Sequence, residues 1–99
     1  MKKDPQIAAR VKEILDLIKK TSPGKSIELR IPPYGAIQCV VGINHKRGTP
    51  PNTVVMSAQV LIQLRQNPQR WEEFVTSGQI TASGVASDLS PVFSQLSKE

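Results

Sequence analysis

Residues 45–52 read HKRGTPPN and place the only histidine of the chain beside two cations, a glycine and two prolines. His45, Lys46 and Arg47 could hold a carboxylate or a phosphate, with backbone N–H groups near Gly48 assisting. The segment lacks the Lys-Ser/Thr pair of a Walker-type loop and the glycine pattern of a dinucleotide site. Glycine, proline and asparagine are also ordinary turn residues. We therefore expect a strand connection, and a headgroup contact at the three basic residues stays open.

Cys39 and His45 could in principle act as a nucleophile and its base. That chemistry needs a thiolate held by a positioned imidazole, commonly with a third group that orients the base. Cys39 lies instead in an apolar run, where a free cysteine usually behaves as a small hydrophobic residue. The scattered acids offer no pair whose spacing would place two carboxyl groups on a common face. We expect no catalytic residue and no enzymatic activity.

The chain has 99 residues, which predicts a single domain spanning 1–99, because two halves would each bury too little surface. One cysteine excludes an internal disulfide, and no Cys/His cluster could hold a metal ion. No cofactor motif is present, and we expect none to be bound. The N-terminal segment lacks the continuous apolar run of a signal peptide, and nothing approaches a membrane-spanning length. These features indicate a cytoplasmic protein.

Charge is distributed unevenly along the chain. The net charge is +5, whereas residues 1–47 alone hold ten cations and four acids. This imbalance allows an anionic partner near the first half, although it also serves solubility. Only four aromatic residues occur, and no basic-aromatic alternation supports nucleic-acid binding. A weak contact with acidic membranes would use Lys2, Lys3, Lys19, Lys20 and Lys25.

Hydrophobic spacing predicts an N-terminal helix over about 4–20, with Asp4 as its cap and Pro5 at its first position. The period then changes to two over 26–31, which indicates a strand with one wet face. A second strand over 36–42 is expected to pair with it as a hairpin. This second run is less polar, so we expect it to lie nearer the centre of the sheet.

The sheet and the later helices are expected over about 26–97. After the first two strands, a third strand is expected over 53–57 and a helix over 58–66. A second short helix follows from Pro68, then a strand over 79–83, and a final helix capped by Asp88. Strands followed by helices indicate the α+β class. We expect a single layer of four or five mostly antiparallel strands, covered on one face by helices.

Three stretches resemble a known family: IPPYGAIQCVVG at 31–42, HKRGTPPNTVV at 45–55 and SGQITASGVASDLSP at 77–91. They are similar to a short bacterial family related to the sterol carrier proteins, the non-specific lipid-transfer domains. The resemblance covers about residues 22–91. It implies a curved sheet with helices on one side and an apolar tunnel between them, partly closed by the C-terminal segment.

The same resemblance implies a non-catalytic domain that binds or carries a hydrophobic, lipid-like ligand of the fatty-acyl or sterol-like kind. The tunnel wall would come from the strands and from the helices opposite, with the last helix as a lid. On this sequence the ligand-binding residues would be Ile37, Cys39, Val41, Val54, Met56, Trp71, Phe74, Phe93 and Leu96.

An empty tunnel is costly for a domain of this size. At about 24 cal/mol per Å³, an unfilled apolar space of about 300 Å³ would cost about 7 kcal/mol, against a total stability of about 5 to 15 kcal/mol. The tunnel is therefore filled by ligand, has shrunk, or is replaced by a homodimer contact. The alternative function is a protein-protein interaction module on the same fold without an open pocket, docking through its sheet edge or its Trp71 face.

Overall fold

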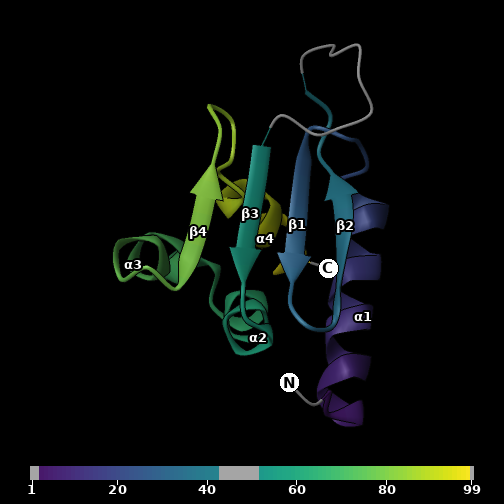
Figure 1. Ribbon diagram of the computed structural model, residues 1–99. Helices are drawn as coiled ribbons and strands as arrows, with labels where there is room; N and C mark the ends of the chain where they lie inside the picture. Colours follow the sequence, from purple (N-terminus) through teal and green to yellow (C-terminus); the bar gives the residue numbers. More distant parts are fainter. Residues whose placement is uncertain (1–2, 43–51, 99) are drawn as a thin grey trace.

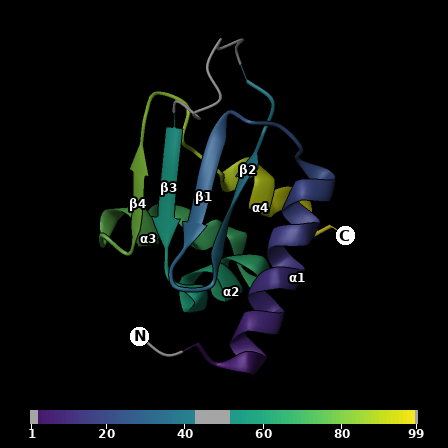
Figure 2. The same cartoon turned by 45° about the vertical axis from the view of Figure 1, so that its right-hand side comes forward.

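The computed structural model describes residues 3–42 and 52–98, and in this part of the chain one sheet is covered by helices on one face (Figures 1 and 2). The α+β class expected from the sequence is confirmed. No helix among these residues is both long and apolar enough to cross a bilayer. The elements are α1 (Pro5–Thr21), β1 (Ile27–Ile31), β2 (Gly35–Cys39), β3 (Asn52–Met56), α2 (Ala58–Gln66), the 3₁₀ turn η1 (Pro68–Arg70), α3 (Trp71–Thr76), β4 (Ile80–Ser83) and α4 (Ser90–Leu96).

The sheet has the strand order β2-β1-β3-β4 (Figure 1). The predicted β1–β2 hairpin is present, and β3 pairs with β4 in the same antiparallel sense. The two central strands, β1 and β3, run parallel. The expectation that the second strand lies centrally was wrong, because β2 forms an edge of the sheet. Its apolar run is only partly buried: Cys39 lies in the core and Ile37 is half-buried, while α1 packs beside the strand.

The second strand also ends earlier than predicted, at Cys39 and not at residue 42. Val40 has a positive φ of 68°, which turns the chain out of the extended conformation. Its amide donates a hydrogen bond to the carbonyl of Ser22 at 2.8 Å. Gly24 has a φ of 148°, and a Cβ at this position would overlap the Val40 carbonyl. The backbone N–H and C=O groups of Val40, which a longer strand would have paired with β1, are instead hydrogen-bonded to the residues that follow α1.

The helix α1 begins as predicted. The carboxylate of Asp4 accepts hydrogen bonds from the amides of Gln6 and Ile7, at 2.8 and 3.4 Å, and so caps the first turn. One stripe of the helix is buried against α2, α4 and β2. Its members, at helical spacing, are Val11, Ile14, Leu15 and Ile18.

Period-two alternation places the apolar side chains of the sheet on the face that the helices cover. In β1 the buried residues are Ile27, Leu29 and Ile31, whereas Glu28 and Arg30 point to the opposite face and pair at 3.0 Å. The uncovered face carries mostly small and polar side chains. The core of the domain therefore lies between the sheet and α1, α2, α3 and α4 (Figure 2).

Candidate functional site

The structure brings most of the predicted tunnel wall together between the sheet and the helices. Seven of the nine residues are buried and belong to one continuous apolar cluster: Cys39, Val54, Met56, Trp71, Phe74, Phe93 and Leu96. Ile37 is half-buried and packs against this cluster at the edge strand β2. The side chains that would line a tunnel thus fill the protein interior with their own atoms.

Val41 differs from the prediction. Its side chain is 79% exposed, and it follows the turn at Val40 that ends β2. The family resemblance implied that Val41 lies in the tunnel wall with Ile37 and Cys39, but the positive φ of Val40 turns the chain before this residue. Val41 is therefore no part of the apolar cluster.

The predicted lid contacts the rest of the cluster through an aromatic pair. The ring centroids of Trp71, at the start of α3, and Phe93, in α4, lie 6.3 Å apart, with the ring planes tilted by 30°. Val92 and Leu96 complete the buried side of α4, so this helix of 7 residues has three side chains in the core. Asp88 lies two residues before the start of α4, and its carboxylate accepts a hydrogen bond from the Ser90 amide at 2.8 Å. The N-cap position itself is Leu89, so the prediction that Asp88 caps this helix was off by one residue.

Cys39 is fully buried, and burial raises the pKa of its thiol to about 11. The thiol is therefore protonated at neutral pH, which is unsuited to nucleophilic chemistry. His45, the other half of the pair considered from the sequence, lies outside the described residues together with Lys46 and Arg47. Among the described residues no group of three or more His, Cys, Asp or Glu side chains could hold a metal ion.

A buried polar residue that the sequence did not reveal fixes the segment before α4. Asn52, 2% exposed, starts β3 within the apolar face of the sheet. Its amide nitrogen donates to the Ser26 carbonyl at 3.0 Å, and its amide oxygen accepts from the Ala86 amide at 3.1 Å. One side chain therefore links the start of β1 to the loop between β4 and α4.

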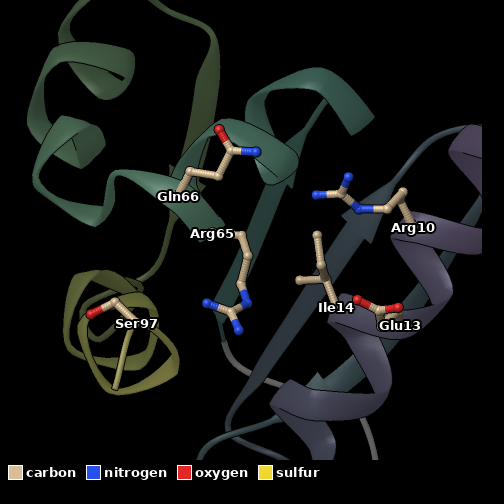
Figure 3. A pocket seen from close by; sticks show the side chains of 6 residues that line it. All are labelled: Arg10, Glu13, Ile14, Arg65, Gln66 and Ser97. Atoms are coloured by element: carbon tan, nitrogen blue, oxygen red, sulfur yellow. The ribbon is translucent and has the colours of Figure 1, made fainter. Parts of the chain in front are cut away.

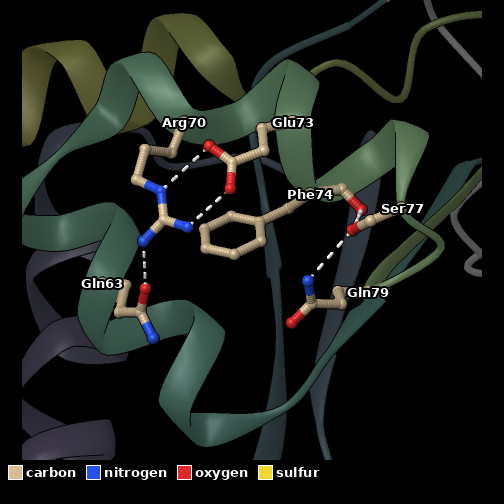
Figure 4. A network of polar contacts seen from close by, with 6 residues as sticks. All are labelled: Gln63, Arg70, Glu73, Phe74, Ser77 and Gln79. Atoms are coloured by element: carbon tan, nitrogen blue, oxygen red, sulfur yellow. Dashed lines mark hydrogen bonds and ion pairs between the residues drawn. The ribbon is translucent and has the colours of Figure 1, made fainter.

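A second polar network covers Phe74 (Figure 4). The guanidinium of Arg70 lies 4.4 Å from the centroid of the Phe74 ring. It donates two hydrogen bonds to the carboxylate of Glu73, from Nε at 3.2 Å and from Nη2 at 2.6 Å, and a third to Gln63 of α2. The hydrogen bond from Arg70 lowers the pKa of Glu73. This network joins η1, α2 and α3 over the end of the core.

A surface groove of about 440 Å³ lies where α1, α2 and α4 meet (Figure 3). It is mostly polar and was not predicted. Three of its residues have the i, i+3, i+4 spacing of one helical face, but their meeting with the ends of α2 and α4 depends on tertiary packing. The lining residues are Arg10, Glu13, Ile14, Arg65, Gln66 and Ser97.

A mixed sheet covered on one face by helices, with an apolar cluster between them, is the architecture that the resemblance to sterol carrier proteins implied. The chain belongs to a family described as bacterial SCP ortholog, whose model matches residues 3–94. No curated protein matches the chain. A solved structure titled "UbiJ-SCP2 Ubiquinone synthesis protein" is similar in fold, with a TM-score of 0.57 and 17% sequence identity over 99% of this chain and 94% of that chain.

Proposed function

We propose that the domain binds and carries a hydrophobic, lipid-like ligand and does no chemistry on it. The observation that carries this proposal is the continuous apolar cluster between the sheet and the helices, closed on one side by α4. Membership of the sterol carrier family supports the same role. A cytoplasmic location is part of this proposal.

Because the protein's own side chains fill the cluster, a ligand must displace some of them. We take the displaced element to be α4, because this short helix closes one side of the cluster through Val92, Phe93 and Leu96. Exposing three such side chains costs about 1.5 to 3 kcal/mol each, or about 5 to 9 kcal/mol together. This cost is comparable to the whole stability of a small domain, about 5 to 15 kcal/mol. The guest must therefore bury a similar apolar area in exchange.

This balance selects for long acyl chains. Each buried CH₂ contributes about 0.8 kcal/mol, so a chain of about twelve buried CH₂ groups offsets the whole range of this cost, whereas a chain of about six reaches only its lower end. Titration with a fluorescent long-chain fatty acid, displaced by unlabelled acids of increasing length, tests the proposal. We expect saturable one-to-one binding that appears only with the longer chains, and co-purified lipid in native mass spectrometry. Long acids that neither bind nor co-purify would overturn the proposal.

The second candidate is an interaction module without an open pocket, as considered from the sequence. Trp71 is 4% exposed, so its face is not available for docking. The edge strand β4 is the better docking surface for this candidate. Thr81, Ala82 and Ser83 are exposed on it, and residues 77–87 carry no charge. Uncharged edge strands are templates for pairing with a further strand. Concentration-dependent dimerisation, or a folded domain that takes up no lipid, would favour this role.

Contact with acidic membranes would assist lipid carriage. Lys19 and Lys20 lie in the last turn of α1 and are exposed. Each lysine near an anionic surface contributes about 1 kcal/mol of attraction that salt screens. Binding to anionic vesicles should weaken as salt rises, and should be absent for neutral vesicles. Binding that ignores salt would contradict this accessory role.

A further inference from the structure

The groove at the junction of α1, α2 and α4 carries an inference that rests on the proposed function. We infer that it holds the carboxylate headgroup of an acyl ligand, between the guanidinium groups of Arg10 and Arg65. The acyl chain would then enter the apolar cluster beside Ile14.

Three helices position the groove. Arg10, Glu13 and Ile14 share one face of α1, Arg65 and Gln66 are the last two residues of α2, and Ser97 directly follows α4. The three helices contact one another pairwise. The groove is therefore bounded by α4, the element whose displacement would open the core.

Two cations face this groove without a carboxylate partner. Among the ion pairs of the described residues, none involves Arg10 or Arg65, whereas Lys12, Arg30 and Arg70 are each paired. Figure 3 shows the two guanidinium groups on different sides of Ile14, one from α1 and the other from α2. Planar guanidinium groups bind carboxylates with paired hydrogen bonds.

The surroundings favour a single negative charge on the ligand. Glu13 also lines the groove, so two cations are opposed by one carboxylate. The C-terminal ends of α2 and α4 add partial negative charge nearby. A carboxylate monoanion therefore fits this site better than a phosphate dianion, which Glu13 and the two helix ends would repel about twice as strongly.

The floor of the groove connects the headgroup position to the interior. Ile14 lines the groove, yet it is only 2% exposed and belongs to the core cluster. A carboxylate held above Ile14 leaves its first methylene groups against the apolar side of α1. When α4 moves away from α1, the chain has a continuous apolar path from this point toward Phe93.

The test compares a long-chain fatty acid with its methyl ester, which has the same chain and no charge. We expect the wild-type domain to bind the acid about tenfold more tightly, as one charge-assisted contact would give. Arg10→Gln and Arg65→Gln should each remove most of this preference and leave ester binding unchanged. Lys19→Gln, which removes an exposed cation of α1 outside the groove, is the matched control and should keep the preference.

Glu13→Gln gives a readout of opposite sign. Removing its charge should tighten acid binding about threefold and leave the ester unchanged, as expected for one screened like-charge contact. Inorganic phosphate, added at constant ionic strength, should not displace the acid, which would identify the bound anion as lipid-borne. Equal binding of acid and ester by the wild type would overturn this inference and leave the carrier role intact. Displacement of the bound acid by inorganic phosphate would have the same two consequences. Binding of neither compound would overturn both.

Discussion

The rings of Trp71 and Phe93 lie 6.3 Å apart between centroids and join α3 to α4 across the end of the apolar cluster. Trp71 is the only tryptophan of the chain, and Phe93 is fully buried. The fluorescence of Trp71 therefore reports directly on the position of α4.

Substituting Phe93→Ala removes the aromatic partner and leaves a cavity in the core. Because α4 is short, we expect a loss of about 3 to 5 kcal/mol in the free energy of unfolding, measured by urea denaturation followed through Trp71 emission. Phe93→Leu keeps most of the volume and should cost about 1.5 kcal/mol or less. Equal stability of the alanine variant and the wild type would show that α4 contributes little to the fold.

Ligand binding should change the same signal. If an acyl chain displaces α4, Trp71 exchanges the Phe93 ring for methylene groups, and its emission should shift on titration with a long-chain acid. Phe93→Leu should bind the acid at least as tightly as the wild type, because less aromatic contact is lost when α4 moves. Saturable binding without any change in Trp71 emission would mean that the ligand lies elsewhere.

Asn52 offers a separate test of how the loop before α4 is held. In Asn52→Ala the Ser26 carbonyl and the Ala86 amide lose their partner, which should cost about 1 to 3 kcal/mol. Amide hydrogen exchange of Ala86 should accelerate in this variant, whereas exchange in the centre of α1 should change only by the global loss. Asn52→Asp is the more demanding variant: it buries a carboxylate beside the Ser26 carbonyl, so its stability should rise as pH falls. Unchanged exchange at Ala86 would contradict the linking role of Asn52.

Local patterns in the sequence predicted most of the fold. The cap at Asp4, the alternation of β1 and the 3.6-residue spacing around Val92 and Phe93 are each decided within a few residues, and their elements occur in the structure. The edge position of β2 was wrongly predicted, because the apolar content of this run does not correspond to burial: only Cys39 of the strand is buried. Strand order depends on long-range packing.

In the candidate site, too, features decided by neighbouring residues could be predicted, whereas those that depend on tertiary packing could not. Buried apolar residues such as Val54 and Met56 could be found from alternation. Val41 was misplaced because a positive φ at Val40, a residue for which this conformation is rare, changes the direction of the chain. The groove between Arg10 and Arg65 joins residues 55 positions apart, and no local signal connects them.

The ion pair between Arg70 and Glu73 predicts a measurable titration. The hydrogen bond from Arg70 lowers the pKa of Glu73, so its stabilising contribution is present above the ordinary pKa of about 4.3 and is lost as pH falls through the lowered value. In Arg70→Gln the Glu73 pKa, followed by carboxyl-carbon NMR, should return to the ordinary range. Lys12 is far from Glu73 in sequence and pairs with Asp16, so Lys12→Gln is the control and should leave the Glu73 pKa unchanged. A Glu73 pKa that is the same with and without Arg70 would contradict this contact.

The thiol of Cys39 makes stability depend on pH at the alkaline end. Its pKa is about 11 in the folded protein and about 9 when exposed, so between these values the unfolded chain loses a proton that the folded chain keeps. Stability should therefore fall as pH rises from about 9 to 11, by about 2 to 3 kcal/mol from this group alone. The measurement is the difference between wild type and Cys39→Ala, in which this part of the decrease should be absent. At neutral pH the native thiol should react with iodoacetamide only at the rate of local unfolding, and rapid labelling under native conditions would show that Cys39 is reached from solvent.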